Sequence, residues 1–113
     1  MREIKFRGRY CRGIENAGPW VYWGVIGSDA LDCIDGDTIG QYTGLLDKNG
    51  VEIYEGDIYT QGDKNIKYVV VFKSAKFAGK QVGNESLAGL SYWQDRIEVI
   101  GNIHENPELL EAP

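Results

Sequence analysis

The chain has 113 residues, of which 42% are hydrophobic, 12% aromatic and 26% charged. This composition is typical of one folded domain and argues against a disordered chain, so we expect a single domain over residues 1–113. The formal net charge of −5 disfavours non-specific binding to nucleic acids, which depends on clustered lysine and arginine. Glycine, with 15 residues, is about twice as frequent as in an average protein and indicates many turns.

The sequence also indicates a cellular location. No apolar run approaches the roughly 18 residues of a membrane span, and the charged first residues do not resemble a signal peptide. The two cysteines, Cys11 and Cys33, form no C-x-x-C unit. We therefore expect a cytoplasmic protein with reduced thiols and no membrane contact.

Three segments of the first half have strand patterns. Residues 4–10 alternate between apolar and basic side chains, which predicts a half-buried strand with a cationic solvent face formed by Lys5, Arg7 and Arg9. Residues 20–26 are rich in aromatic and β-branched side chains, and residues 38–43 form another short extended segment.

The second half contains closely spaced strands. Asn49-Gly50 predicts a turn before a strand over residues 51–54, and Glu55-Gly56-Asp57 predicts a tight turn before a strand at residues 58–59. Residues 66–73 form the most regular strand, predicted to be buried on both faces. Residues 97–103 predict the last strand, with Gly101 at a bulge or close approach.

The end of the chain predicts a short helix, because Asn106 precedes Pro107 as a cap residue precedes a first helical proline. Leu109 and Leu110 are expected to dock this helix. Residues 74–96 give no clear prediction. The fold class is therefore mainly β, a small antiparallel β-barrel (SH3-like or a sandwich) with a short C-terminal helix.

Catalytic and metal-binding motifs are missing from the sequence. The single histidine, His104, and the two cysteines lack zinc-site spacing, and the acidic clusters at residues 32–37 and 47–52 lack EF-hand spacing. No P-loop, dinucleotide fingerprint or serine elbow is present. We predict no catalytic residue, no metal and no cofactor; a hydrolase that pairs Cys11 or Cys33 with His104 is a third hypothesis.

The basic N-terminal segment has two interpretations. The first twelve residues carry five basic residues and one acidic residue, although the whole chain is acidic. The cations could form a solvated face paired with acidic neighbours such as Glu98, or a contact for an anion or phosphate. The aromatic side chains are expected mainly in the core, and an exposed fraction would suit a protein interface.

Four stretches stand out together: MREIKFR at 1–7, IGQYTGL at 39–45 followed by DKNG at 47–50, EIYEGDI at 52–58, and VIGNIHENPELL at 99–110. In this order they resemble the YopX family, small proteins of bacteriophages and prophages. Leu46 departs from the charged residue expected there, and residues 74–96 show no family pattern. The resemblance implies an accessory viral protein made in a bacterial cytoplasm, and it implies no activity or catalytic residue.

Most residues of these stretches have turn chemistry, and the predicted turn residues are Gly44, Asn49, Gly50, Gly56 and Asp57. The polar residues that turns do not need form a candidate surface site: Gln41, Tyr42, Thr43, Tyr54 and Asn102. We predict a non-enzymatic accessory protein that acts by protein–protein contact, as a homo-oligomer and with an unknown host or phage protein. The alternative is a nucleic-acid or phosphate-binding module that uses Lys5, Arg7 and Arg9.

Overall fold

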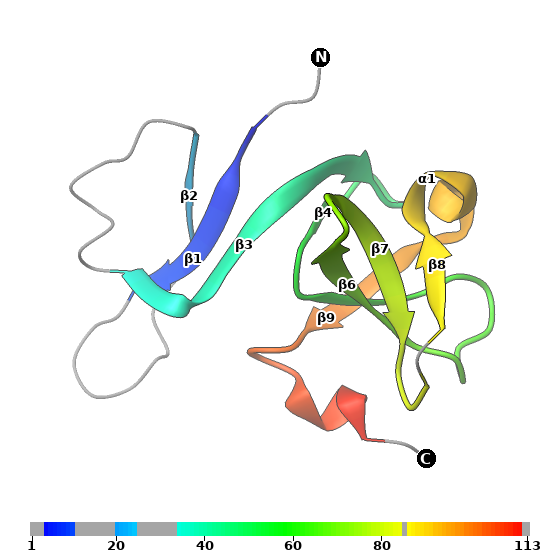
Figure 1. Ribbon diagram of the computed structural model, residues 1–113. Helices are drawn as coiled ribbons and strands as arrows, with labels where there is room; N and C mark the ends of the chain where they lie inside the picture. The colour runs from blue at the N-terminus through cyan, green and yellow to red at the C-terminus, as the bar shows by residue number, and fades with distance from the viewer. Residues whose placement is uncertain (1–3, 11–19, 25–33, 85, 112–113) are drawn as a thin grey trace. The chain divides into compact units, whose positions relative to one another are not determined.

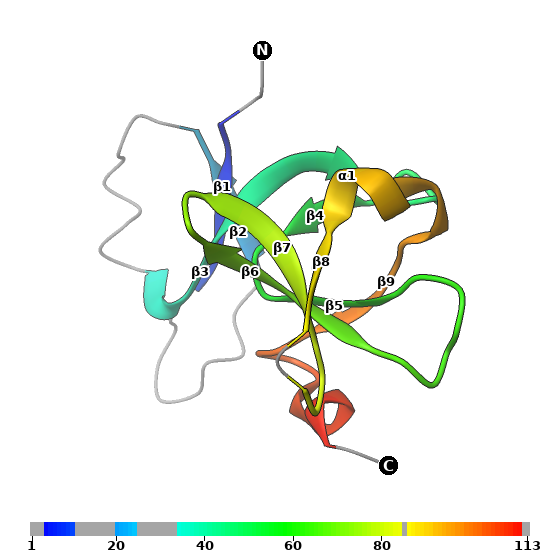
Figure 2. The same cartoon turned by 45° about the vertical axis from the view of Figure 1, so that its right-hand side comes forward.

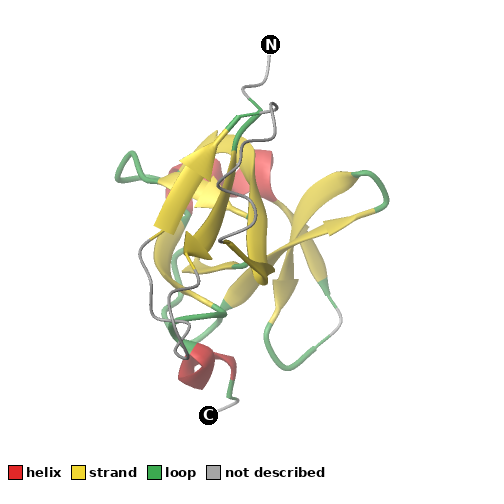
Figure 3. Cartoon of the chain, turned by 90° about the vertical axis from the view of Figure 1, so that its left-hand side faces the viewer, coloured by secondary structure: helices red, strands yellow, loops and turns green. Residues whose placement is uncertain are grey.

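The computed structural model describes residues 4–10, 20–24, 34–84 and 86–111 (Figure 1). Strands, drawn in yellow in Figure 3, predominate in this part of the chain, and their paired neighbours run antiparallel. The expected mainly β, antiparallel fold is therefore confirmed. The chain forms two compact units, Met1–Tyr42 and Thr43–Pro113, and the single domain expected over residues 1–113 stays a prediction.

The first unit contains three adjacent strands in the order β2-β1-β3. They are β1 (Phe6–Tyr10), β2 (Trp20–Trp23) and β3 (Ile34–Leu46), whose last residues belong to the second unit. Phe6 pairs with Trp23, and their rings stack with centroids 6.1 Å apart. Aromatic side chains that face each other across paired strands stabilise such a sheet, which explains why the aromatic segment at residues 20–23 is a strand.

The second unit begins with the end of β3 and its neighbour β4 (Glu52–Tyr54), and then forms a five-stranded sheet in the order β8-β7-β6-β5-β9. Figure 1 shows β6, β7 and β8, and Figure 2 shows β5 beside β9. The strands of this sheet are β5 (Asp57–Thr60), β6 (Tyr68–Lys73), β7 (Lys76–Gln81), β8 (Leu87–Gly89) and β9 (Glu98–Asn102).

Three short helical segments complete the second unit. The four-residue helix α1 (Leu90–Trp93) follows β8, and the 3-10 helices η2 (Gln94–Arg96) and η3 (Pro107–Leu110) come before and after β9. The hydrophobic core of this unit contains Ile53, Tyr59, Val70, Leu90 and Ile97. The ring of Tyr59 is fully buried and lies against Gly79, where a side chain would collide with it.

The predicted turns at Gly50 and Gly56 are present. Gly50 and Gly56 have positive φ angles of 83° and 93°, a conformation that glycine adopts without steric cost. In the turn before β5, the Asp57 carboxylate accepts a hydrogen bond from the Tyr54 N–H at 2.8 Å. Gly101 is a close-approach site, because a Cβ there would lie 2.5 Å from the Asn106 side-chain oxygen.

Several finer expectations are wrong. The described strands form two sheets with free end strands, so they do not close into a barrel; a sandwich stays a prediction. The C-terminal helix is a single 3-10 turn, and the Asn106 side chain accepts a hydrogen bond from the Asn102 N–H instead of capping it. Strand β6 is not buried on both faces, because Phe72 is half exposed. Gly44 lies inside β3 and not in a chain reversal, although its φ is +88°.

Candidate functional site

The predicted cationic face of β1 is partly buried, because Arg7 is buried and Lys5 and Arg9 are half-buried. The Arg7 side chain is only 8% exposed, and its guanidinium lies 4.4 Å from the centre of the Trp20 ring. Arg9 lies 5.6 Å from the same ring, and the Lys5 ammonium lies 5.3 Å from the centre of the Tyr42 ring. Such cation–π contacts are favourable by about 0.5–2 kcal/mol each, so these cations stabilise the first unit itself.

A pairing of this face with Glu98 stays a prediction. Glu98 begins β9 in the second unit, and its carboxylate lies 3.6 Å from the Lys48 ammonium. The strand that carries the cations, β1, lies between β2 and β3. Arg9 donates its backbone N–H to the Thr38 hydroxyl at 2.8 Å, which links β1 to β3 at the register shift between these strands.

The five polar residues of the candidate surface site are not gathered on a surface. Gln41 is half-buried, and the other four are buried: Tyr42, Thr43, Tyr54 and Asn102. The Thr43 hydroxyl donates to the Ile53 carbonyl at 2.8 Å, and the Asn102 side-chain oxygen accepts the N–H groups of His104 and Glu105. Their resolved contacts stabilise strands and turns, and a binding role for them stays a prediction.

A structural residue that the sequence did not identify is Asp47. Its carboxylate is buried and accepts three backbone N–H groups, those of Asn49 at 2.8 Å, Val51 at 2.9 Å and Val99 at 3.0 Å. The first two bonds close the turn that contains Asn49 and Gly50, and the third joins this turn to β9. Residues 47–51 therefore form a turn, at the place where Asn49-Gly50 predicted one.

The Cys–His hypothesis falls largely outside the described residues, since these do not include Cys11 or Cys33. His104 is half-buried, and its ring lies beside Gly56. Among the residues that the structure describes, no three metal-ligating side chains lie together. None of the helical segments in this part of the chain has the length and apolar character needed to span a bilayer.

The second unit contains a basic segment that the sequence analysis overlooked. Residues 64–84 carry five lysines and no carboxylate, in a chain whose net charge is −5. Four of these lysines are exposed: Lys64, Lys73, Lys76 and Lys80. The segment forms the β6–β7 hairpin, and a count of charges along the sequence would have found it.

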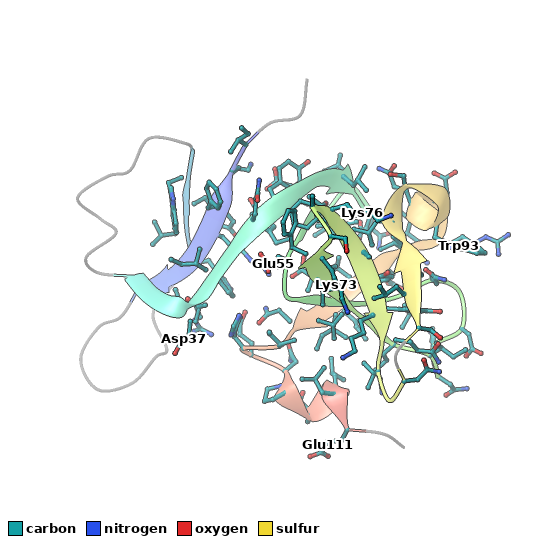
Figure 4. All side chains as sticks on the ribbon, viewed as in Figure 1. Asp37, Glu55, Lys73, Lys76, Trp93 and Glu111 are labelled. Atoms are coloured by element: carbon teal, nitrogen blue, oxygen red, sulfur yellow. The ribbon has the colours of Figure 1, made fainter. Side chains whose placement is uncertain are left out.

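The tip of this hairpin departs from the usual chemistry of tight turns. Lys73 and Lys76 form its last cross-strand pair, with only Ser74 and Ala75 between them. Both central residues have positive φ angles, 56° and 65°, where such turns normally use asparagine and glycine. Like charges directly opposite each other are unfavourable as well. Figure 4 labels both lysines.

Apolar side chains lie next to these lysines. Phe72 is 50% exposed and contacts Phe77 edge to face, with ring centroids 4.9 Å apart. A hollow of about 250 Å³ extends from the tip to β8. We call it the lysine hollow, and its main lining residues are Lys73, Lys76, Ala78, Leu87 and Gly89.

Comparison with known proteins identifies the family. The family described as YopX protein matches residues 14–111, which is most of the chain and includes parts of both units. The chain belongs to the YopX family. This confirms the resemblance seen in the sequence, and it extends the match across residues 74–96, where β7, β8 and α1 lie.

A solved structure is similar to this YopX-family chain over almost its full length. It is the crystal structure of protein EF1440 from Enterococcus faecalis, which is 26% identical with a TM-score of 0.59. The similarity covers 98% of this chain and 100% of that one. No curated protein matches the chain.

Proposed function

We propose that this YopX-family chain is a non-enzymatic accessory protein of a bacteriophage or prophage that acts in the bacterial cytoplasm by protein–protein contact. The contact surface is the end of the β6–β7 hairpin together with the lysine hollow. The proposal includes contact with a second copy of the chain and with a host or phage protein.

The observation that supports this proposal most directly is the 50% exposure of two large apolar side chains near the hairpin, Phe72 in β6 and Leu87 in β8. Large apolar side chains with a polar rim are typical of protein-binding surfaces, where aromatic residues dominate the binding energy. Among the aromatic side chains of this unit that the structure describes, Phe72 is the most exposed, and a partner can cover it.

The test compares the wild-type chain with Phe72→Ser and with the control Leu46→Ser, which replaces another exposed apolar residue of the second unit. Proteins captured by the wild-type chain are purified, and their affinities for all three chains are measured. We expect Phe72→Ser to weaken binding at least about tenfold, a loss of roughly 1.4 kcal/mol, and Leu46→Ser to have little effect. Equal binding by all three chains would contradict the proposal.

Self-association has a separate measurement. Sedimentation of the wild-type chain at increasing concentration is expected to show an average mass that rises above that of the monomer. Leu87→Ser is expected to shift this rise to higher concentration. A strict monomer that also binds no other protein would contradict the proposed function.

A second candidate function is binding of nucleic acid or phosphate, and the lysines of residues 64–84 favour it. The original candidate cations, Lys5, Arg7 and Arg9, are packed on aromatic rings of their own unit. Binding to oligonucleotides should then weaken with salt and with Lys73→Glu combined with Lys76→Glu. No binding at low salt would remove this candidate.

A further inference from the structure

We propose that the outer edge of β8, together with the lysine hollow, binds an extended acidic polypeptide segment as an additional strand of the five-stranded sheet. This inference rests on the proposed function and specifies the chemistry of the partner. It is argued from the hydrogen-bond pattern of β8, from the charges beside it and from the shape of the hollow.

Strand β8 is an end strand of its sheet, because the strand order begins β8-β7. The Gln81 N–H donates to the Ser86 carbonyl at 3.0 Å. Bonded and non-bonded residue pairs alternate along antiparallel strands, so the next bonded pair after Gln81–Ser86 is Gly79–Ala88. Leu87, which pairs with Lys80 between them, therefore points its N–H and C=O away from β7. A donor and an acceptor on one outward-facing residue complement the backbone of another strand, as in β-strand addition.

The side chains beside this edge favour an acidic partner. By the registers of β6, β7 and β8, Lys73, Lys76 and Leu87 share one face of the sheet. No ion pair joins Lys73 or Lys76 to a carboxylate within the described part of the chain. Carboxylates on the added strand would relieve the repulsion between these two lysines, and the methylene groups of a glutamate on the same face would cover Leu87.

The shape of the hollow leaves a path from the edge to the lysines. Gly89 has no side chain, and a Cβ built on it would meet nothing within 4 Å. Ala78, its partner on β7, adds only a methyl group. A glutamate side chain on the added strand can therefore pass over Gly89 toward Lys76.

The conformation of the hairpin tip supports a binding role. Left-handed backbone at Ser74 and Ala75 and the opposed lysines both reduce the stability of the fold. Unfavourable local features of this kind tend to gather where a surface serves binding. A polypeptide is favoured over a nucleic acid because only a polypeptide can satisfy the outward N–H and C=O of Leu87 together with the lysines.

The experiment uses the full chain and a labelled synthetic peptide of alternating glutamate and valine, with a lysine–valine peptide and oligothymidylate as comparison probes. Binding is measured by fluorescence anisotropy, and the contact is mapped from the amide NMR signals of the chain. We expect the glutamate peptide alone to bind well, with the largest shifts at residues 73–78 and 87–89. Tighter binding of oligothymidylate with the same map would overturn the inference in favour of a nucleic acid.

Charge variants test the role of the two lysines. Lys73→Glu combined with Lys76→Glu is expected to weaken glutamate-peptide binding at least about tenfold. The matched control, Lys64→Glu combined with Lys67→Glu, changes the net charge equally on the same segment and is expected to change the affinity less than about threefold. Equal losses for both double variants would show attraction by overall charge and would overturn the inference.

Leu87 variants test strand addition itself. Leu87→Pro removes the outward N–H without removing a bond to β7, and proline is tolerated at such edge positions. It should abolish binding, whereas Leu87→Ser, which keeps the N–H, should bind more weakly than wild type but measurably. Far-UV circular dichroism verifies that both variants fold. Wild-type affinity for Leu87→Pro would overturn the inference, and partner capture that still depends on Phe72 would then leave the proposed function standing.

Discussion

Lys73 faces Lys76 across the last residue pair of the β6–β7 hairpin, so two cations close a turn within a stretch, residues 64–84, that contains no carboxylate. Sheets normally place opposite charges or apolar side chains in such pairs, because like charges reduce stability. The pair is therefore expected to favour binding of an anionic partner at the cost of some stability. Stability and binding should respond in opposite directions when it is changed.

Lys73→Glu should stabilise the chain, because it converts a like-charge pair into an opposite-charge pair. We expect the free energy of unfolding in urea to rise by about 0.5–1 kcal/mol, while affinity for the acidic peptide falls. Lys64→Glu, on an exposed lysine outside the strands, should change stability by less than about 0.5 kcal/mol. A loss of stability in Lys73→Glu would show that the two lysines do not repel each other.

The turn residues of the same hairpin give a second prediction. Ser74→Asn combined with Ala75→Gly places the preferred residues at two positive φ angles. We expect a stabilisation of about 1–2 kcal/mol by urea denaturation. Unchanged or reduced stability would contradict the left-handed conformation at this turn.

Close packing at Gly79 gives a third prediction. A Cβ at this position would lie 2.7 Å from the Cζ atom of the Tyr59 ring, which is buried and cannot move into solvent. Gly79→Ala should therefore reduce the free energy of unfolding by about 2–3 kcal/mol. Gly89→Ala, with open space around its Cβ, serves as the control and should be tolerated. Equal stability of the two variants would refute this packing.

Tyr59 also makes stability depend on alkaline pH. Burial, with Tyr68 beside it as the smaller cause, raises the pKa of the Tyr59 hydroxyl above its ordinary value. In the unfolded chain this hydroxyl ionises near pH 10, so above about that pH only the unfolded state releases the proton. Stability should therefore fall as pH rises beyond about 10 and should not depend on this group at lower pH.

The measurement for Tyr59 is urea denaturation between neutral and alkaline pH. Tyr59→Phe should reduce the alkaline loss of stability, and Tyr22→Phe, at an exposed tyrosine, should leave it in place. The Tyr59 hydroxyl has no hydrogen-bond partner among the described residues, so its removal should not destabilise the chain at neutral pH. An undiminished alkaline loss in Tyr59→Phe would assign the effect to another group.

Asp47 gives the fifth prediction. Asp47→Ala leaves the N–H groups of Asn49, Val51 and Val99 without their acceptor and should cost about 3 kcal/mol of stability. Asp63→Ala removes one exposed bond to the Asn65 N–H and should cost less than about 1 kcal/mol. Thermal denaturation compares the two variants, and a comparable loss in both would contradict the structural role of Asp47.

The sequence predicted features that depend on a few neighbouring residues. The sequence predicted the turns at Gly50 and Gly56 and the close approach at Gly101. Glycine adopts positive φ angles and allows close approach more readily than other residues. The β6–β7 turn was missed for the opposite reason, because Ser74 and Ala75 carry no turn signal. With the turn unrecognised, residues 74–96 could not be assigned to β7, β8 and α1.

The sites were harder to predict because burial depends on distant parts of the chain. Arg7 alternates with apolar residues like a solvent-facing side chain, yet the ring of Trp20, from the next strand β2, lies against its guanidinium. Thr43 and Tyr54 are polar but buried, since their strands lie next to the core. The lysines of the hairpin, in contrast, could have been found from the charges alone, because no carboxylate interrupts residues 64–84.

Photo-crosslinking inside bacterial cells tests most directly whether the hairpin end contacts a protein. Benzoylphenylalanine replaces either Leu87, beside the lysine hollow, or Leu46, an exposed leucine elsewhere in the same unit. We predict protein adducts from position 87 that diminish when Lys73→Glu and Lys76→Glu are added, and few adducts from position 46. Equal adducts from both positions, or adducts with nucleic acid only, would contradict the account.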